Sequence, residues 1–468
     1  MLIARIVTAT ILTIYAGVLT SLYRHRISWQ NESAVIKMTG WICIGYLLPL
    51  VLIFSRNDGN FFDFIVLCLF CPVLWLILGV FKRFGYSGPL NLFLLSAMIS
   101  AVAGLVTQYR LNLYIEKGLL ARFIGGERGL PIAVSQFIYI VISMAVVSTL
   151  IATGYLNKLL SIIEEKTDAL FWGAVSVLLL VLLFVAKKIS GSGAPTLLSG
   201  SLQPTEIVYK FCFILFLSKY LSRTGMAMVL SFYPVRQMIK EVIILFGLIC
   251  VFFLVPMLTE MGTALLLFLT FTVLISLISK RWYFIPLGGL TAVIGVFGIT
   301  VVSARMKERV FHAWLNWQEY ISQAGMQPFK AYSAFHGSGI FGTGITNGYP
   351  KMTKIASDYV LVAVGEEWGV IGLVLITAGY LLILKEVYLL RTIKPDFRGI
   401  LLLGLPLTIV VQAFFHISAN LGLFVLSGLP LPFISLGGSA YLISFLTVGT
   451  IMTLMNGKTE DAEVKKGE

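Results

Sequence analysis

Long apolar runs separated by short polar segments fill most of this 468-residue chain. A helix that crosses the hydrocarbon core of a membrane needs about 20 mostly apolar residues. The apolar runs predict thirteen such helices, which makes the fold class an all-α polytopic membrane protein. Their approximate extents are 3–22, 36–55, 62–81, 89–107, 131–153, 168–187, 206–222, 241–257, 262–279, 283–303, 358–384, 399–417 and 437–456.

Two segments interrupt this pattern in an informative way. Residues 428–440 read GLPLPFISLGGSA, and prolines and glycines in quick alternation cannot continue a helix. Irregular backbone at membrane depth must be buried in protein or line a wet cavity, because lipid offers no hydrogen-bond partners. The second segment is a long extracytoplasmic loop, 304–357, which is rich in aromatic residues and so is not disordered by composition. Its glycine run, 337–344, is either a phosphate-approaching loop or a plain flexible turn.

Composition supports the membrane class and excludes others. The chain is 58% hydrophobic and 12% charged, with a mean hydropathy of +0.92, which a soluble domain could not bury. The net charge of +13 does not indicate nucleic-acid binding, because no basic tract with interleaved aromatics stands outside the spans. Most basic residues instead lie on one set of loops, which places the C-terminus in the cytoplasm and Met1 outside. Basic residues on the opposite face, Arg110 among them, are best interpreted as solvated loop charges.

Glu260 is the first ionisable residue whose place beside a predicted membrane span calls for an explanation. It lies between two apolar runs with almost no loop, at or just under the outer surface. A carboxylate in such a recess has little water, which raises its pKa and suits it to act as a general base. A glutamate that stabilises the first turn of a helix is an equally good interpretation.

Glu206 and Lys210 begin another predicted span. They lie four residues apart, so they share a helix face and can pair. A helix cap with an internal ion pair is the simpler interpretation, and direct participation in substrate binding is the alternative.

Further charges lie at the outer ends of the later spans. Asp358 begins a span, and Glu366 follows two turns deeper on nearly the same face, beside Glu367. Two buried acids in one helix are unlikely to be idle, and Lys210 is a candidate partner for one of them. Arg309, with Lys307, opens the long outer loop, where an arginine suits bidentate phosphate binding or is simply a surface residue.

No metal site is expected from the histidines. The four histidines show no metal-ligand spacing, so no metal ligand is assigned.

Five ordered motifs resemble the SEDS family of RodA, FtsW and SpoVE proteins. They are SLQPTE, LTEMGTAL, the Arg309 region ahead of HGSGIFGTG, SDYVLVAVGEEWG and SGLPLPFISLGGSA, and weaker similarity extends back to about residue 88. The resemblance implies a ten-helix core over 88–456, preceded by a three-helix membrane extension over 1–87 and followed by a cytoplasmic tail over 457–468.

The resemblance also implies an activity. Members of the family are peptidoglycan glycosyltransferases, which polymerise lipid II into glycan strands at the outer face of the bacterial cytoplasmic membrane, usually with a class B penicillin-binding protein. Carried over, Glu260 is the general base, while Arg309 and nearby basic groups, with a divalent cation (Mg²⁺ or Mn²⁺) as a further option, hold the diphosphate. Further candidate substrate-binding residues are Lys307, Lys210, Glu206, Asp358, Glu366, Ser435, Gly437 and Gly438.

Two departures from the family pattern keep other functions open. Glu260 stands where the family has aspartate, and GAPTLLSG (193–200) lacks the family's arginine and tryptophan. A lipid II flippase and a non-catalytic scaffold of a division or sporulation complex are therefore the alternatives. The ionisable residues cluster towards the outer half of the spans, which favours surface chemistry over translocation.

Overall fold

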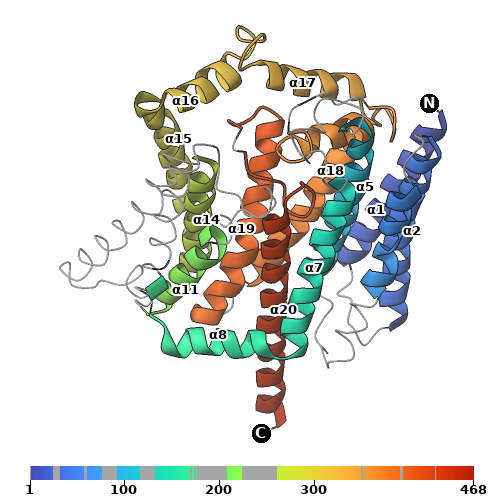
Figure 1. Cartoon of the computed structure of the whole chain (residues 1–468). Helices are drawn as coiled ribbons and strands as arrows, with labels where there is room; N and C mark the ends of the chain where they lie inside the picture. Colours follow the sequence, from blue (N-terminus) through green and yellow to red (C-terminus); the bar gives the residue numbers. More distant parts are fainter. Residues whose placement is uncertain are drawn as a thin grey trace.

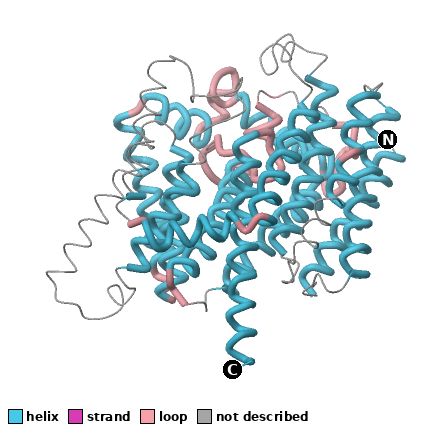
Figure 2. Tube along the Cα trace, turned by 60° about the horizontal axis from the view of Figure 1, so that its bottom comes forward, coloured by secondary structure: helices cyan, strands magenta, loops and turns pink. Residues whose placement is uncertain are grey.

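The computed structural model describes residues 2–24, 32–56, 61–75, 92–115, 132–168, 171, 172, 175, 208–223, 261–348, 352, 354–390, 394–426 and 428–467. Within these ranges the regular structure is helical and contains no strand (Figure 2). Seven of the described helices are long and apolar enough to cross a membrane. The predicted all-α polytopic architecture is therefore confirmed.

Helices occupy eleven of the thirteen predicted spans, and the other two, 168–187 and 241–257, lie largely outside the described residues. Seven helices cover spans from the first half of the chain and its middle: α1 (Leu2–Arg24), α2 (Glu32–Arg56), α3 (Phe61–Cys68), α5 (Leu92–Ile115), α7 (Ile132–Ala152), α11 (Phe213–Arg223) and α14 (Met261–Ser279). Four more are α15 (Phe284–Val302), α18 (Val360–Leu390), α19 (Phe397–Asn420) and α20 (Gly438–Gly467), while a π-helical turn, η1 (Val208–Cys212), leads into α11.

Helix α19 forms the centre of the bundle. It packs against α11, α14, α18 and α20 (Figure 1). Of its most apolar 18-residue stretch, 89% is buried. Its sequence is apolar on almost every face, as expected of a helix with protein on all sides. In helix α15, by contrast, only 28% of the corresponding 18-residue stretch is buried. Its apolar side chains therefore face outward, as those of a lipid-facing span do.

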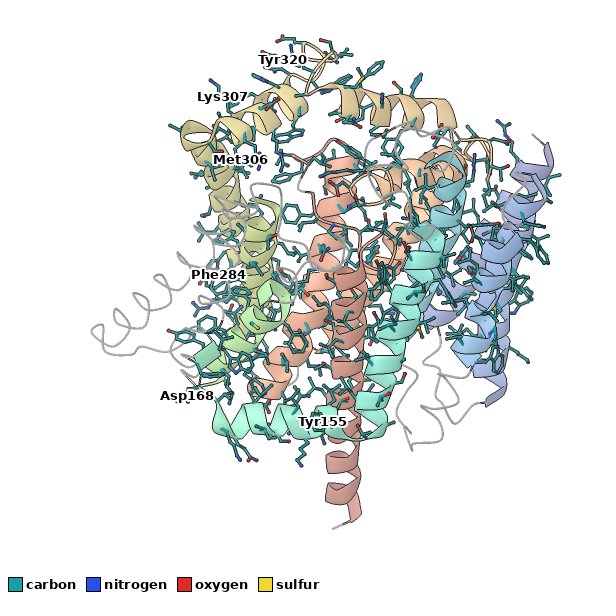
Figure 3. All side chains as sticks on the ribbon, viewed as in Figure 1. Tyr155, Asp168, Phe284, Met306, Lys307 and Tyr320 are labelled. Atoms are coloured by element: carbon teal, nitrogen blue, oxygen red, sulfur yellow. The ribbon has the colours of Figure 1, made fainter. Side chains whose placement is uncertain are left out.

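Two elements cross the ends of the bundle. Within the described part of the long loop, three helices form an arm: α16 (Ala304–Lys307), η2 (Glu308–Leu315) and α17 (Met326–Ser338). The short helix α8 (Tyr155–Lys166) crosses the other end, where Glu164 accepts a hydrogen bond from Arg398 at 2.7 Å. Lys307 and Tyr320 on the arm therefore lie opposite Tyr155 at the start of α8 (Figure 3).

The first and last described helices point to opposite ends of the bundle, which is what the predicted thirteen spans would require. Helix α1 begins near the arm, and α20 ends beyond α8 (Figure 1). Helices α1 and α2 pack against α18 and α5 respectively. The division into 1–87, 88–456 and 457–468 stays a prediction.

The broken segment before α20 is buried, and its backbone is satisfied by side chains of the surrounding helices. A buried carbonyl without a partner is costly, and far more so away from water. The carbonyls of Leu429, Pro430, Pro432, Phe433 and Ile434 accept hydrogen bonds from His416, Gln412, Tyr380, Tyr441 and the pair Gln108 and Gln136, in that order. The carbonyl of Leu431 accepts from two amides of the segment itself. Residues 428–437 thus form a fixed segment rather than a flexible link, and this segment is called the plug below.

Gly104 of α5 makes this plug possible, which gives a first prediction. A Cβ on Gly104 would lie 2.7 Å from the Phe433 carbonyl oxygen and 2.9 Å from the Ile434 Cα, both backbone atoms. Gly104→Ala should therefore destabilise the protein by about 1–3 kcal/mol, the usual cost of overpacking a dense interior. Gly379→Ala in α18 is the matched control, because nothing lies within 4 Å of its new Cβ. Thermal unfolding in detergent measures both, and equal midpoints would contradict the prediction.

Candidate functional site

The predicted site residues are distributed over the arm end of the bundle and its interior. Glu260 and Glu206 lie outside the described residues, although α14 begins at Met261, directly after Glu260. Lys307 and Arg309 lie exposed on the arm, while Lys210 is buried in η1 with 5% exposure. Asp358 lies in the turn before α18, and Glu366 lies inside α18. Ser435 and Gly437 belong to the plug, and Gly438 begins α20.

A cavity of about 310 Å³ lies between the arm and the bundle. The arm supplies one wall, and the turn before α18 and the end of α19 supply the other. Its lining includes Arg305, Glu308, Arg309, Trp314, Gln327, Tyr332, Tyr359, Asn420 and Phe424. Of the predicted site residues that the structure describes, Arg309 lines this cavity.

The arm is fixed over the cavity by contacts with the turn after α19. The indole N–H of Trp314 donates to the Gly422 carbonyl at 2.9 Å, and the Trp314 ring packs against Phe424. Gly422 has φ +77°, and a Cβ there would lie 2.2 Å from the Tyr332 hydroxyl oxygen. A glycine at this position satisfies both the backbone conformation and the space.

Basic and phenolic groups dominate the chemistry of the cavity walls. Arg305 and Arg309 outnumber the single carboxylate, Glu308, among the lining residues, so the cavity favours an anion. Burial raises the pKa of Tyr359 above its ordinary value, and the nearby Asp358 adds to this effect while Arg309 opposes it. Burial likewise raises the pKa of Tyr332. A phenol is protonated at neutral pH already at its ordinary pKa, and the upward shifts do not change this, so both side chains can donate hydrogen bonds.

Asp358 lies behind the cavity wall and is held by its neighbours. Its carboxylate is 3.4 Å from the ammonium of Lys354, and its side chain is 12% exposed. The side-chain amide of Asn420 donates to the Asp358 carbonyl at 3.0 Å and to the His416 carbonyl. Ser435, from the plug, donates to the neighbouring Ser357 carbonyl at 2.6 Å. Asp358 and Ser435 are thus brought to the same region as Arg309, although they belong to segments far apart in sequence.

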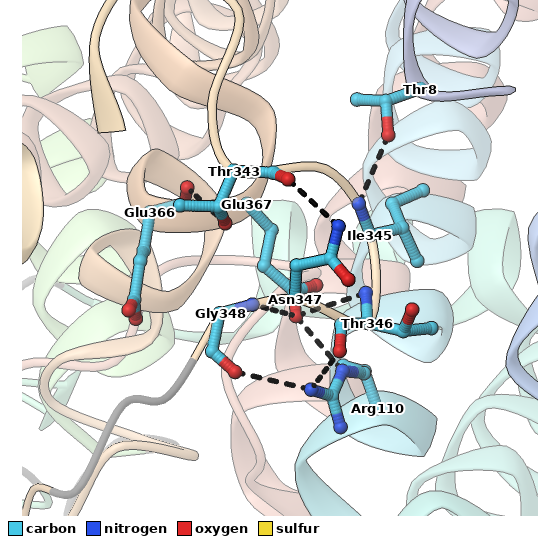
Figure 4. Close-up of polar contacts among 9 residues, drawn as sticks. All are labelled: Thr8, Arg110, Thr343, Ile345, Thr346, Asn347, Gly348, Glu366 and Glu367. Atoms are coloured by element: carbon cyan, nitrogen blue, oxygen red, sulfur yellow. Dashed lines mark hydrogen bonds and ion pairs between the residues drawn. The ribbon is translucent and has the colours of Figure 1, made fainter. Parts of the chain in front are cut away.

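A buried ion pair braces the other half of the long loop (Figure 4). Nε of Arg110 lies 2.8 Å from Oε1 of Glu367, and both side chains are less than a tenth exposed. The guanidinium also donates to the carbonyls of Thr346 and Gly348, at 2.9 and 3.1 Å. Oε1 of Glu367 in turn accepts from the amides of the same two residues, at 3.2 and 3.3 Å. The pair therefore pins residues 346–348 from both sides.

A kink in α18 explains the glycine run of the loop. Gly369 has φ +68° and ψ −165°, which interrupts the helix and frees backbone groups on both sides. The loop satisfies them: the carbonyls of Glu366 and Glu367 accept from the amides of Thr343 and Gly344, and the amides of Val370 and Ile371 donate to the carbonyls of Gly339 and Ile340. Two amides of the run are thus committed to α18. Close backbone contact explains the glycine at position 342, where a Cβ would lie 2.2 Å from the Glu367 carbonyl oxygen, whereas nothing lies within 4 Å of a Cβ at Gly337 or Gly339.

Sequence reasoning missed the role of Arg110. It was interpreted as a solvated loop charge, yet it is 5% exposed within α5 and pairs with Glu367. The Glu367 carboxylate contacts Arg110, and Lys210 as a partner for another acid of α18 stays a prediction. The available signal was the position of Arg110, which lies well inside a continuous helical run and not in a loop.

A divalent cation finds no ligand set in the part of the chain that the structure describes. No three His, Cys, Asp or Glu side chains come together there. The cation therefore stays a prediction from the resemblance.

Comparisons with known proteins agree with this architecture. Residues 90–460 match the sequence model of the FtsW/RodA/SpoVE family, described as cell cycle proteins. The probable peptidoglycan glycosyltransferase FtsW of Trichlorobacter lovleyi is 28% identical over 291 residues, which cover 60% of this chain and 74% of that protein. The peptidoglycan glycosyltransferase RodA of Mycobacterium bovis is 28% identical over 200 residues, which cover 42% of each chain.

A solved structure supports the fold. One chain from a peptidoglycan synthase complex, described as coordinating polymerization and crosslinking, superimposes with a TM-score of 0.51. It is 17% identical, and the alignment covers 78% of this chain and 96% of that one. Because the family match covers most of the chain and the fold agrees with it, this protein belongs to the FtsW/RodA/SpoVE family of cell cycle proteins.

Proposed function

We propose that this protein is a peptidoglycan glycosyltransferase that polymerises lipid II at the outer face of the bacterial cytoplasmic membrane. The observation that carries the proposal is the cavity under the arm, which has an excess of arginine over carboxylate and lies at the end of a bundle of membrane helices. The relatives named as peptidoglycan glycosyltransferases support the same activity.

The reaction needs a base and a site for a departing anion. A sugar hydroxyl of one lipid II molecule attacks the anomeric carbon of another, and the bond to the diphosphate breaks as the new glycosidic bond forms. The proton of the hydroxyl passes to the Glu260 carboxylate, and undecaprenyl diphosphate leaves with the bonding electrons. Arg309 and Lys307 would stabilise the negative charge on the diphosphate, since charge that develops in the transition state is where fixed cations act most.

The orientation follows from the position of this site. If the arm end faces outward, then α20, which ends beyond α8, carries the C-terminus into the cytoplasm. The predicted distribution of basic loops requires the same orientation. A class B penicillin-binding protein, which cross-links glycan strands, is the proposed partner.

Purified protein incubated with lipid II and its penicillin-binding partner should produce glycan strands, resolved by gel electrophoresis. Absence of polymer with a competent partner would overturn the enzyme proposal. Movement of lipid II between leaflets without polymer would instead favour the flippase alternative.

Arg309→Gln should lower the polymerisation rate by about tenfold or more, because a cation that contacts the diphosphate stabilises the leaving group. Lys394→Gln is the charge-matched control, since Lys394 is exposed just before α19 begins, at the end opposite the arm. Initial rates at several lipid II concentrations measure both variants. Equal rates for the two would remove Arg309 from the site.

A further inference from the structure

Helix α1 lies outside the segment that matches the family, yet it contacts the loop that packs on the kink of α18. The family match begins at residue 90, and α1 ends at Arg24. The Thr8 side chain is 1% exposed, and its Oγ1 accepts a hydrogen bond from the amide of Ile345 at 3.0 Å (Figure 4). Ile345 is fully buried and belongs to the loop that covers the kink of α18.

A second contact joins α1 to the kink itself. The rings of Tyr15 and Trp368 lie 6.0 Å apart, and both residues are buried. Trp368 directly precedes Gly369, the residue at which α18 is interrupted. Helix α1 therefore contacts both the loop, through Thr8, and the kinked helix α18, through Tyr15.

The contact of Thr8 is specific to one face of α1. Thr10 and Thr13 are exposed, and their hydroxyls donate to carbonyls of their own helix, those of Ile6 and Ala9. A threonine on an exposed helix face commonly bonds in this way. Thr8 instead provides an acceptor for a buried backbone amide of another segment, which would be costly to leave without a partner.

Ile345 lies between two residues that bond to Glu367, so a displacement of the loop at Ile345 would disturb the Arg110–Glu367 ion pair. The preceding amide, of Gly344, donates to the Glu367 carbonyl, and the following amide, of Thr346, donates to the Glu367 carboxylate. A shift of Ile345 would therefore move both contacts of Glu367 and the guanidinium of Arg110 with it. The same helix, α18, begins one residue after Tyr359, which lines the cavity.

We propose that α1 is a built-in positioning element for the outer loop, in which Thr8 holds Ile345 so that residues 339–348 stay seated on the kink of α18. The role of the N-terminal extension is thus to fix, within one chain, this loop and the kinked helix α18, which begins directly after the cavity residue Tyr359. Thr8 is a positioning residue, and its effect on polymerisation, unlike its effect on the loop, rests on the proposed function.

Hydrogen exchange of the protein in detergent tests whether Thr8 holds the loop 339–348 in place. Thr8→Val keeps the shape but removes the acceptor, and we expect exchange of peptides within 340–348 to become about tenfold faster, as loss of a buried hydrogen bond implies. Thr8→Ser should keep the wild-type exchange because it retains the hydroxyl, and Thr10→Val should also keep it. Unchanged exchange in Thr8→Val, or equally fast exchange in Thr8→Ser, would overturn the proposal.

Polymerisation of lipid II by the same variants tests whether the contact of Thr8 affects activity. Thr8→Val should polymerise about tenfold more slowly, because a small misplacement of catalytic groups is costly even when the mutation lies far from them, and Thr8→Ser should restore the rate. A loosened loop with an unchanged rate would overturn the positioning role. If the wild-type protein makes no polymer, the proposed function fails, and the exchange of residues 340–348 still decides whether α1 holds the loop.

Discussion

Glu260→Gln should abolish polymerisation, with a fall of about a hundredfold to ten-thousandfold in rate, the range that a general base contributes. The amide has nearly the shape of the carboxylate but cannot accept the proton of the sugar hydroxyl. Glycan strands made from lipid II by the protein with its penicillin-binding partner provide the measurement. The expected loss is larger than for Arg309→Gln, because other basic groups share the diphosphate charge whereas one carboxylate takes the proton.

Glu260→Asp is the informative companion variant. It restores the residue that the family pattern has at this position, and it shortens the reach of the carboxylate by one methylene. We expect an intermediate rate, since a misplacement near 1 Å can cost about a hundredfold. Substantial polymer from Glu260→Gln would exclude Glu260 as the base. Binding of lipid II should be retained in both variants, which separates a chemical defect from a failure to fold.

Removing one member of the Arg110–Glu367 pair should destabilise the protein by about 3–5 kcal/mol, the cost of leaving a buried charge uncompensated. Arg110→Met leaves the Glu367 carboxylate without its counter-ion, and Glu367→Leu leaves the guanidinium buried beside apolar atoms. Each change also removes two hydrogen bonds to the loop, one at residue 346 and one at residue 348. Thermal unfolding in detergent and hydrogen exchange of the loop measure the effect.

The double variant Arg110→Met with Glu367→Leu should lose less than the sum of the two single losses, because neither charge is then left alone. The pair between Arg398 and Glu164 is the control. Its side chains are 32% and 34% exposed, so Arg398→Met should cost about 1 kcal/mol or less. Additive losses at the buried pair, or a cost as small as at the exposed one, would contradict the assignment of this pair as a structural brace.

Much of the fold was predictable because the lipid constrains it. A span must bury its backbone hydrogen bonds within a helix and present about 20 apolar residues, so the helices α2, α7, α14, α15, α18 and α19 follow closely from hydropathy. The interfacial helix α8 was not predicted, because its 12 residues mix apolar and charged positions and resemble a loop by composition. Its apolar side chains Leu156, Leu160 and Ile163 are buried by neighbours that the sequence does not reveal.

The candidate site was predictable only in part. The sequence indicated that Arg309, Asp358 and the plug matter, and the tertiary structure brings these to one region around the cavity. It did not indicate Tyr332, Tyr359 or Asn420, because aromatic and amide residues are common in such segments and carry no spacing signal. Whether Glu366 and the plug residues contact substrate stays a prediction.

The sequence by itself determined that this chain is a helical membrane protein of the FtsW/RodA/SpoVE type, since hydropathy and five ordered motifs depend only on the order of residues. Only the tertiary structure decided which charges are partners. Arg110 and Glu367 are separated by 257 positions, and they meet because α5 packs against α18. The same holds for Thr8 and Ile345, 337 positions apart, since a hydrogen bond depends on distance and direction in space, which no local pattern encodes.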